Sequence, residues 1–390
     1  MESDGIAIVG IALQLPSGSS SIKDLDYDSF WDFLVEGKNA YQPLSDILPN
    51  YAQTHPTLKF PERGTFLKDA TGFDNIALGI STKDARVIPY SGRRLLDLSF
   101  QALLDAGIDS RGQNIGCFMS GNRPLPVESP IDPDGSVSSW MPHSIANRIS
   151  YALDLTGPSV YLDTACSSSL TGLHLAVGAI ERGDCIAALV GAAQINREFV
   201  ILGSHLLLNA EREFPSPYEW ASYMQAGGIL SSDGVCRPFD ATASGFGRGE
   251  GVVVIVLKSF KAAILERDHI YGVIRGSAIN TTGSQMPPNV PNSVAQQRAL
   301  QTRCLPRTYC VVLAVKIFEF YTLTMPVSRS VWRVYRAAKS TAEIYFYRSK
   351  STYYRGKDPD LYLKSARFEH TESEVALQTK SFRFRENGQE

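Results

Sequence analysis

Residues 159–183 read SVYLDTACSSSLTGLHLAVGAIERG, and the interpretation of the whole chain depends on this stretch. Residues 160–162 are β-branched, aromatic and apolar, which is typical of a strand. After a short polar turn, apolar side chains recur at spacings of three and four residues, at Leu170, Leu173, Val177 and Ile180. This spacing predicts a helix that ends at Gly183. Cys166 is therefore expected where a strand passes into the first turn of a helix.

That position suits a nucleophile. Unpaired N–H groups and the positive end of the helix dipole meet at a helix amino terminus, where they favour a thiolate and can donate to a carbonyl oxygen. A cysteine placed there can accept an acyl group and pass it on. The local pattern alone leaves a second interpretation open, in which Cys166 is a small buried hydrophobic residue.

Four segments around Cys166 form a longer pattern: NRISY at 147–151, DL at 154–155, GPSV at 157–160 and DTACSSSL at 163–170. Together they resemble the active-site block of β-ketoacyl synthases. The similarity is closest to the ketosynthase domains of type I polyketide synthases, in the thiolase-like superfamily, and it covers the amino-terminal part of such a domain, residues 1–302. By this resemblance Cys166 is the catalytic nucleophile, and its own backbone N–H is one oxyanion donor.

The resemblance also implies a fold and a set of partners. The expected fold is α/β, a thiolase-like layered αβαβα architecture with its first half and the start of its second half. The substrate would arrive on the phosphopantetheine arm of an acyl carrier protein, with no cofactor or metal bound directly by the chain. The family further implies a homodimer and sibling domains in a megasynthase.

Composition excludes several other classes of protein. The chain has 390 residues with a net charge of −2, which favours neither nucleic acid nor an acidic membrane surface as a partner. Its six cysteines are irregularly spaced and suit neither a disulfide framework nor a Cys-x-x-Cys metal site. We therefore expect reduced thiols in the cytoplasm. The apolar runs are too short to span a membrane.

The remaining pattern predicts further elements. Strands are expected at residues 5–12, 115–119, 185–190 and 252–257, with a turn at 191–193. Residues 270–280 resemble the strand that opens the second half of the family's fold. Residues 30–34 and 292–299 resemble two helices of the family. Another helix is predicted from its apolar face, which is made of Leu95, Leu96, Phe100, Leu103 and Leu104. Residues 41–70 are predicted to form a surface excursion. Arg248 and Glu250 are expected to form a structural ion pair.

The family completes its site with two histidines from the second half, in a His-Gly-Thr-Gly-Thr and an Asn-Ile-Gly-His motif, and neither motif occurs in this sequence. His174 lies two helical turns from Cys166, about 12 Å along the axis, so we expect it to be a core or supporting residue rather than the base. His143 is expected in a loop and His269 in a surface turn, and His370 lacks the glycine context.

A cysteine hydrolase is disfavoured because no histidine is placed to serve the thiol. The alternative to an active synthase is a non-catalytic remnant or an acyl-carrier-interacting protein.

The composition changes near residue 302. Of the 31 glycines, 29 lie in residues 1–302, and the 22 Lys+Arg and 31 Asp+Glu of that part give a charge of −9. Residues 303–390 hold two glycines, 16 Lys+Arg and nine Asp+Glu, which gives +7. We therefore divide the chain into a ketosynthase-like domain, 1–302, and an aberrant or disordered tail, 303–390, without family resemblance.

We predict that a missed intron or a reading-frame shift accounts for this break. Sequencing of transcripts across codons 295–310 should then reveal a splice or frame difference. Independent transcripts that read through this interval cleanly and in frame would contradict the prediction.

Overall fold

The computed structural model describes residues 5–19, 21–47, 59–121, 142–196, 229–238, 240–284, 292–303 and 312–315. Its centre is a six-stranded sheet in the order β5-β4-β6-β7-β1-β8. The strands are β1 (Ile6–Gln14), β4 (Ile115–Gly121), β5 (Ser159–Leu162), β6 (Ala187–Gln194), β7 (Gly251–Ser259) and β8 (Gly272–Ile274). β4 runs parallel to β5 and β6, whereas β7 runs antiparallel to both β6 and β1.

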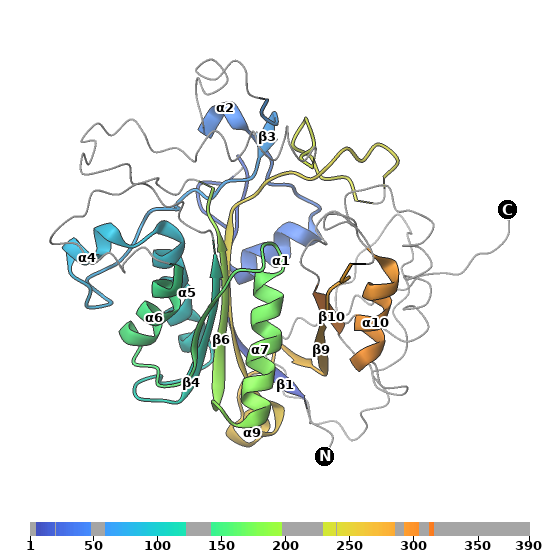
Figure 1. Cartoon of the computed structure of the whole chain (residues 1–390). Helices are drawn as coiled ribbons and strands as arrows, with labels where there is room; N and C mark the ends of the chain where they lie inside the picture. The colour runs from blue at the N-terminus through green and yellow to red at the C-terminus, as the bar shows by residue number, and fades with distance from the viewer. Residues whose placement is uncertain are drawn as a thin grey trace, which may run out of the picture.

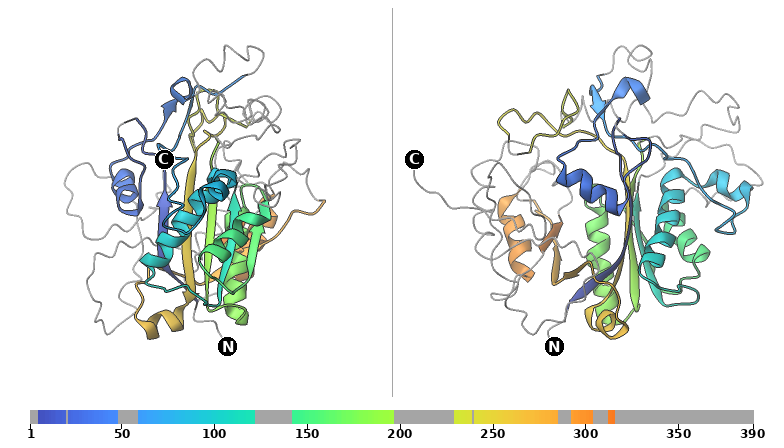
Figure 2. Two further views of the ribbon diagram at one scale, coloured as in Figure 1. Left: turned by 90° about the vertical axis from the view of Figure 1, so that its left-hand side faces the viewer. Right: turned by 180° about the vertical axis from the view of Figure 1, so that it is seen from behind.

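Helices cover both faces of this sheet. The described helices of the chain are α1 (Tyr27–Val35), α2 (Leu44–Ile47), α4 (Thr82–Val87), α5 (Tyr90–Asp105), α6 (Pro142–Ala152), α7 (Ser168–Arg182), α9 (Phe260–Glu266) and α10 (Ser293–Arg303). α5 packs on β1, β6 and β7, and α6 packs on β4 and β5. α7 packs on β4 and β6 from the opposite side, so the sheet separates it from α5 and α6 (Figure 2).

A second sheet begins on the far side of α7. β9 (Gly276–Ile279) pairs in parallel with β10 (Val312–Val315), and α10 lies between these strands in the chain and packs against both. Because α7 also contacts β9 and β10, five layers follow one another: α5 and α6, the large sheet, α7, the small sheet and α10 (Figure 1). The predicted layered αβαβα architecture is confirmed. A further pair, β2 (Gln42–Pro43) with β3 (Arg63–Gly64), lies outside these layers.

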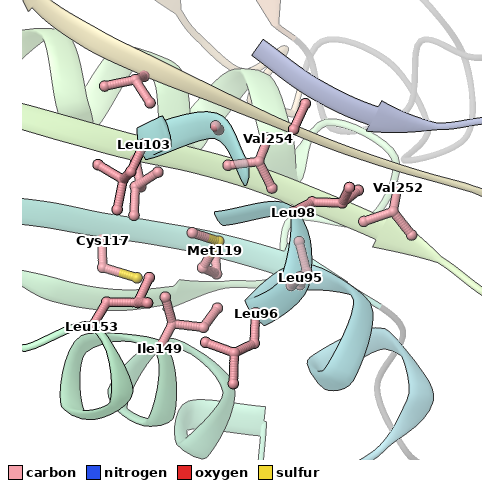
Figure 3. Packing of buried hydrophobic residues seen from close by; sticks show 14 of the residues in the cluster. Leu95, Leu96, Leu98, Leu103, Cys117, Met119, Ile149, Leu153, Val252 and Val254 are labelled. Atoms are coloured by element: carbon pink, nitrogen blue, oxygen red, sulfur yellow. The ribbon is translucent and has the colours of Figure 1, made fainter. Parts of the chain in front are cut away.

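Two hydrophobic clusters fill the space between the layers. The larger one lies between α5, α6 and the sheet, and Figure 3 shows Leu95, Leu96 and Ile149 of these helices gathered in one cluster with Met119 and Val254 of the strands. The smaller one lies between the sheet and α7 and includes residues of the predicted stripe of this helix. Ile274 of β8 also belongs to this smaller cluster, so the buried residues of α7 and the edge strand β8 share one core.

Two positions require glycine, one for a close approach between helix and strand and the other for a helix end. A Cβ atom on Gly10 of β1 would lie 2.3 Å from the carbonyl oxygen of Ala102 in α5, so only glycine allows this contact between helix and sheet. Gly183 adopts φ 79° and ends α7, as the sequence predicts.

Several details differ from expectation. The apolar face of α5 is narrower than predicted, because Leu95, Leu96 and Leu103 are at most 2% exposed whereas Phe100 is 44% and Leu104 is 62% exposed. The turn predicted at 191–193 is wrong, since β6 continues through it to Gln194.

The surface excursion predicted at 41–70 is wrong in part. Phe66 and Leu67 are each 1% exposed, and Leu44 packs against Phe66 in a small cluster of its own.

The strand predicted at 270–280 is in fact two strands. β8 pairs with β1 in the large sheet, the chain passes over at Arg275, and β9 belongs to the small sheet. The chain therefore crosses from one sheet to the other within a single residue.

β10 lies in the region predicted to be a tail outside the fold, and its pairing with β9 was not expected from the sequence. Residues 304–311 and 316–390 lie outside the described residues, and the boundary at 302 stays a prediction.

Two leucines of α5 provide a matched test of the packing. We predict that Leu95→Ala lowers the free energy of unfolding by about 2–5 kcal/mol, because it leaves a cavity in the larger cluster. Leu104→Ala changes the same side chain on the solvent-exposed face, so its effect should stay within about 0.5 kcal/mol. Urea denaturation followed by circular dichroism measures both variants, and equal effects would contradict the described orientation of α5.

Candidate active site

Cys166 lies between the end of β5 and the start of α7, and its side chain is exposed. β5 runs parallel to β4 and β6, so their carboxyl ends share one edge of the sheet, which is where open α/β sheets bind ligands. The predicted location between strand and helix is confirmed. The interpretation of Cys166 as a buried hydrophobic residue is wrong.

The residue before the cysteine has an unusual backbone. Ala165 adopts φ 54°, in the left-handed region that residues with a Cβ atom avoid. Its N–H donates to Oδ1 of Asp163 at 3.1 Å. The chain thus turns sharply between Leu162 and Cys166 and leaves the thiol at the outside of the turn.

Hydroxyl groups fill the inside of this turn. Ser167 Oγ donates to the carbonyl oxygen of Thr164 at 2.8 Å, and Ser168 Oγ donates to that of Ala165 at 2.6 Å. The N–H of Thr164 donates to Ser168 Oγ at 2.7 Å. The Oγ1 atom of Thr164 lies 2.9 Å from Ser167 Oγ and 3.2 Å from Oγ1 of Thr171, one turn along α7. Both serines are buried, so these bonds are shielded from competing water.

The amino terminus of α7 keeps free donors. Ser167 occupies the N-cap position, but its hydroxyl makes no capping bond because it points back to Thr164. Within the described part of the chain, no group accepts a hydrogen bond from the N–H of Ser169 or Leu170. Such unpaired groups carry the positive end of the helix dipole, so this end of α7 can stabilise negative charge that develops near the cysteine.

The other described cysteines occupy different surroundings. Cys117 of β4 lies in the larger cluster between the sheet and α6 (Figure 3), and burial raises the pKa of its thiol to about 12. Burial also raises the pKa of the Cys185 thiol. Cys236 is half-buried, and Cys304 and Cys310 lie outside the described residues. Among the four described thiols, Cys166 is the one classed as exposed.

The described histidines do not gather at the thiol. His174 faces the second sheet, where its Nδ1 lies 2.8 Å from Oγ of Ser277 in β9, so it connects α7 to the second half of the fold. This supports its interpretation as a supporting residue. His269 is exposed, as predicted, and its ring packs edge-on against Tyr271. The loop predicted around His143 is wrong, because this residue belongs to the first turn of α6. His370 lies outside the described residues.

A buried polar network lies at the same edge of the sheet, where β6 ends and β7 begins. Nη2 of Arg248 donates to Oδ1 of Asn196 at 2.8 Å, and Oε1 of Glu250 accepts from the N–H of Asn196 at 2.9 Å. The other carboxylate oxygen of Glu250 accepts from the N–H of Leu67 at 2.9 Å. The two charged residues therefore meet at Asn196 and hold the segment around Leu67, whereas a direct ion pair between them stays a prediction. Asn196 was not predicted from the sequence, because an asparagine after a strand gives no sign of its remote partners.

The described residues hold no group of three or more His, Cys, Asp or Glu side chains that could bind a metal ion. None of the described helices is both long and apolar enough to cross a membrane.

Comparison with known proteins gives a consistent result. The family model described as "Beta-ketoacyl synthase, N-terminal domain" matches residues 3–205 and 214–263. The chain is 39% identical over 308 residues to the highly reducing polyketide synthase stpks1 of Strobilurus tenacellus. It is 36% identical over 306 residues to a phenolphthiocerol/phthiocerol polyketide synthase of Mycobacterium tuberculosis. These alignments cover 76% and 75% of the chain but 10% and 18% of the two relatives.

Solved structures agree with the sequence relatives. The oxazolomycin ketosynthase domain OzmH KS7 of Streptomyces albus JA3453 matches with a TM-score of 0.64 and 28% identity. The ketosynthase from module 1 of the bacillaene synthase of Bacillus amyloliquefaciens FZB42 matches with a TM-score of 0.62 and 28% identity. In both cases the alignment covers 77% of this chain and 51% of the solved chain, so this chain spans about half of a solved ketosynthase domain.

The different surroundings of the thiols predict their reactivity. In the native protein, iodoacetamide should label Cys166 within minutes, whereas Cys117 and Cys185 should react only after denaturation, because the thiolate is the reactive form and burial disfavours it. Mass spectrometry of proteolytic peptides measures each site separately, with Cys166→Ala as the control. Native labelling of Cys117 at the same rate as Cys166 would contradict the described burial.

Proposed function

Because the chain belongs to the β-ketoacyl synthase family, we propose that Cys166 accepts an acyl group from a thioester and holds it for decarboxylative condensation with a malonyl unit on an acyl carrier protein. The single observation that carries this proposal is the exposed thiol between β5 and α7, next to N–H groups that find no acceptor among the described residues. The family assignment supplies the class of reaction. The chain itself supplies the nucleophile and the donors around it.

The loading step follows from this geometry. The Cys166 sulfur attacks the thioester carbonyl carbon, and the carbonyl oxygen becomes negatively charged in the tetrahedral intermediate. N–H groups at the start of α7 would stabilise that charge, with the N–H of Cys166 itself as the family's donor. The carbon–sulfur bond to the carrier then breaks. The carrier leaves as a thiol with the proton that Cys166 gave up, and the acyl group stays on Cys166.

The condensation step needs more than this. Loss of carbon dioxide from the malonyl thioester leaves an enolate, whose carbon attacks the acyl carbonyl and releases Cys166. In the family two histidines of the second half stabilise the enolate and the oxyanion, and their motifs are absent from this sequence. Among the described histidines, His174 bonds with Ser277 and His269 packs on Tyr271. This favours a second candidate function, a remnant that exchanges acyl groups with a carrier and forms no carbon–carbon bond.

The partners follow from the same proposal. The acyl group would arrive on the phosphopantetheine arm of an acyl carrier protein, and sibling domains of a megasynthase would supply the substrates, in the cytoplasm. We also propose a homodimer. In support of it, β5 is an edge strand of the large sheet within the described residues, and Tyr151 of the adjoining α6 is 89% exposed.

An acyl-transfer assay tests the proposal. Incubation with an acyl-N-acetylcysteamine thioester should add one acyl group to the protein, and this mass shift should be absent in Cys166→Ala. Addition of malonyl-acyl carrier protein then separates the candidates. A β-ketoacyl product supports the synthase, a stable acyl-enzyme without product supports the remnant, and a wild-type protein that takes up no acyl group contradicts both.

A further inference from the structure

The backbone turn before Cys166 needs an external restraint. A left-handed conformation at a residue with a side chain is disfavoured, and it persists only where its surroundings hold it. Ala165 adopts this conformation with φ 54°, directly before the nucleophile. Whatever holds Ala165 therefore also determines where the Cys166 sulfur points.

One side chain holds both sides of this residue. Ser168 Oγ accepts a hydrogen bond from the N–H of Thr164 at 2.7 Å and donates one to the carbonyl oxygen of Ala165 at 2.6 Å. A hydroxyl can do both at once because it is both donor and acceptor. The backbone N–H of Ser168 donates to the same carbonyl oxygen at 3.0 Å. These three hydrogen bonds, which we call the bracket, connect Ser168 to the N–H of Thr164 and to the carbonyl oxygen of Ala165.

The bracket is anchored in the fold. Ser168 is the first residue of α7 and is 8% exposed, and α7 packs between the two sheets. Its neighbour Ser169 also begins the helix, but its hydroxyl makes no hydrogen bond within the described part of the chain. The two serines therefore differ in contact with the turn and in burial, since Ser168 is buried and Ser169 is half-buried.

We propose that Ser168 is a positioning residue for Cys166: its hydroxyl holds Ala165 in the left-handed conformation and so aims the sulfur toward the thioester. Ser168 does not touch the substrate and acts through the backbone turn. This inference rests on the proposed function, because acyl transfer is the reaction that it would accelerate.

The central experiment compares two alanine variants. Loss of the two hydrogen bonds in Ser168→Ala should slow acylation of Cys166 about tenfold or more. Ser169→Ala keeps the backbone N–H of residue 169 and removes only a hydroxyl that makes no hydrogen bond within the described residues, so this variant should acylate like the wild type. Alkylation of Cys166 by iodoacetamide should change less than twofold in both variants, because a small reagent can approach an exposed thiol from many directions. Equal acylation rates for the two variants would overturn the proposal.

Two further comparisons separate the hydroxyl from the packing. Ser168→Thr and Ser168→Val introduce side chains of nearly equal volume, and only threonine keeps the hydroxyl. Threonine should retain most of the acylation rate and valine should lose it, a difference that remains informative if Ser168→Ala fails to fold. Ala165→Gly should lessen the defect of Ser168→Ala, because glycine adopts positive φ without strain. Thr and Val variants with equal rates, or no effect of glycine, would count against the bracket.

Hydrogen exchange keeps this inference distinguishable from the proposed function. The amide of Thr164 should exchange faster in Ser168→Ala than in Ser169→Ala, since it loses its acceptor. A wild-type protein that is not acylated, but shows this difference in exchange, would refute the acyl-transfer proposal and leave the restraint on Ala165 intact. A wild-type protein that is acylated, with equal exchange at Thr164 in both variants, would refute the restraint alone.

Discussion

The packing of α7 between two sheets is the constraint on which the rest of the structure depends. Its buried residues face the large sheet, where Leu173, Ala176 and Ile180 form the smaller cluster with Phe118 and Val190. On its other side the helix contacts β9 and β10, and His174 bonds to Ser277 there. Because a packed interior allows little movement, a helix held from both sides fixes the position of its first turn. The thiol at that end is therefore placed by the core of the protein, although it is itself exposed.

Local structure was predictable where it is determined by residues that are close together in the sequence. The strand before Cys166, the helix after it and the end of that helix at Gly183 all follow from residue type and spacing. The width of a buried face does not follow in the same way. Phe100 and Leu104 have the right spacing on α5 but lie beyond the surface that the sheet covers, and nothing in the sequence of α5 reveals how far that surface extends.

Contacts between distant segments were harder to predict, for a physical reason. The strand predicted at 270–280 is continuous in apolar character, and its division at Arg275 depends on which partner each half finds, β1 for one and β10 for the other. Asn196 likewise takes its role from Arg248 and Glu250, more than fifty residues away. The family resemblance identified Cys166, whereas the three consecutive serines after it look alike in the sequence. The folded structure distinguishes them, because the hydroxyl of Ser168 bonds to the turn at Ala165 and is buried, whereas Ser169 is half-buried.

The chemical steps also divide between the two halves of the fold. The loading step that we propose depends on a strand, a turn and a helix of the first half, together with the serine hydroxyls that shape the turn, and all of these lie within 24 residues of sequence, 159–182. The condensation step in the family depends on histidines that the second half contributes, and here the described part of that half consists of β9, α10 and β10. Because the two sets of groups come from separate halves, the acyl-accepting geometry can persist where the condensing groups are absent. In the proposed mechanism, acylation of Cys166 and carbon–carbon bond formation are thus separable, and the first does not imply the second.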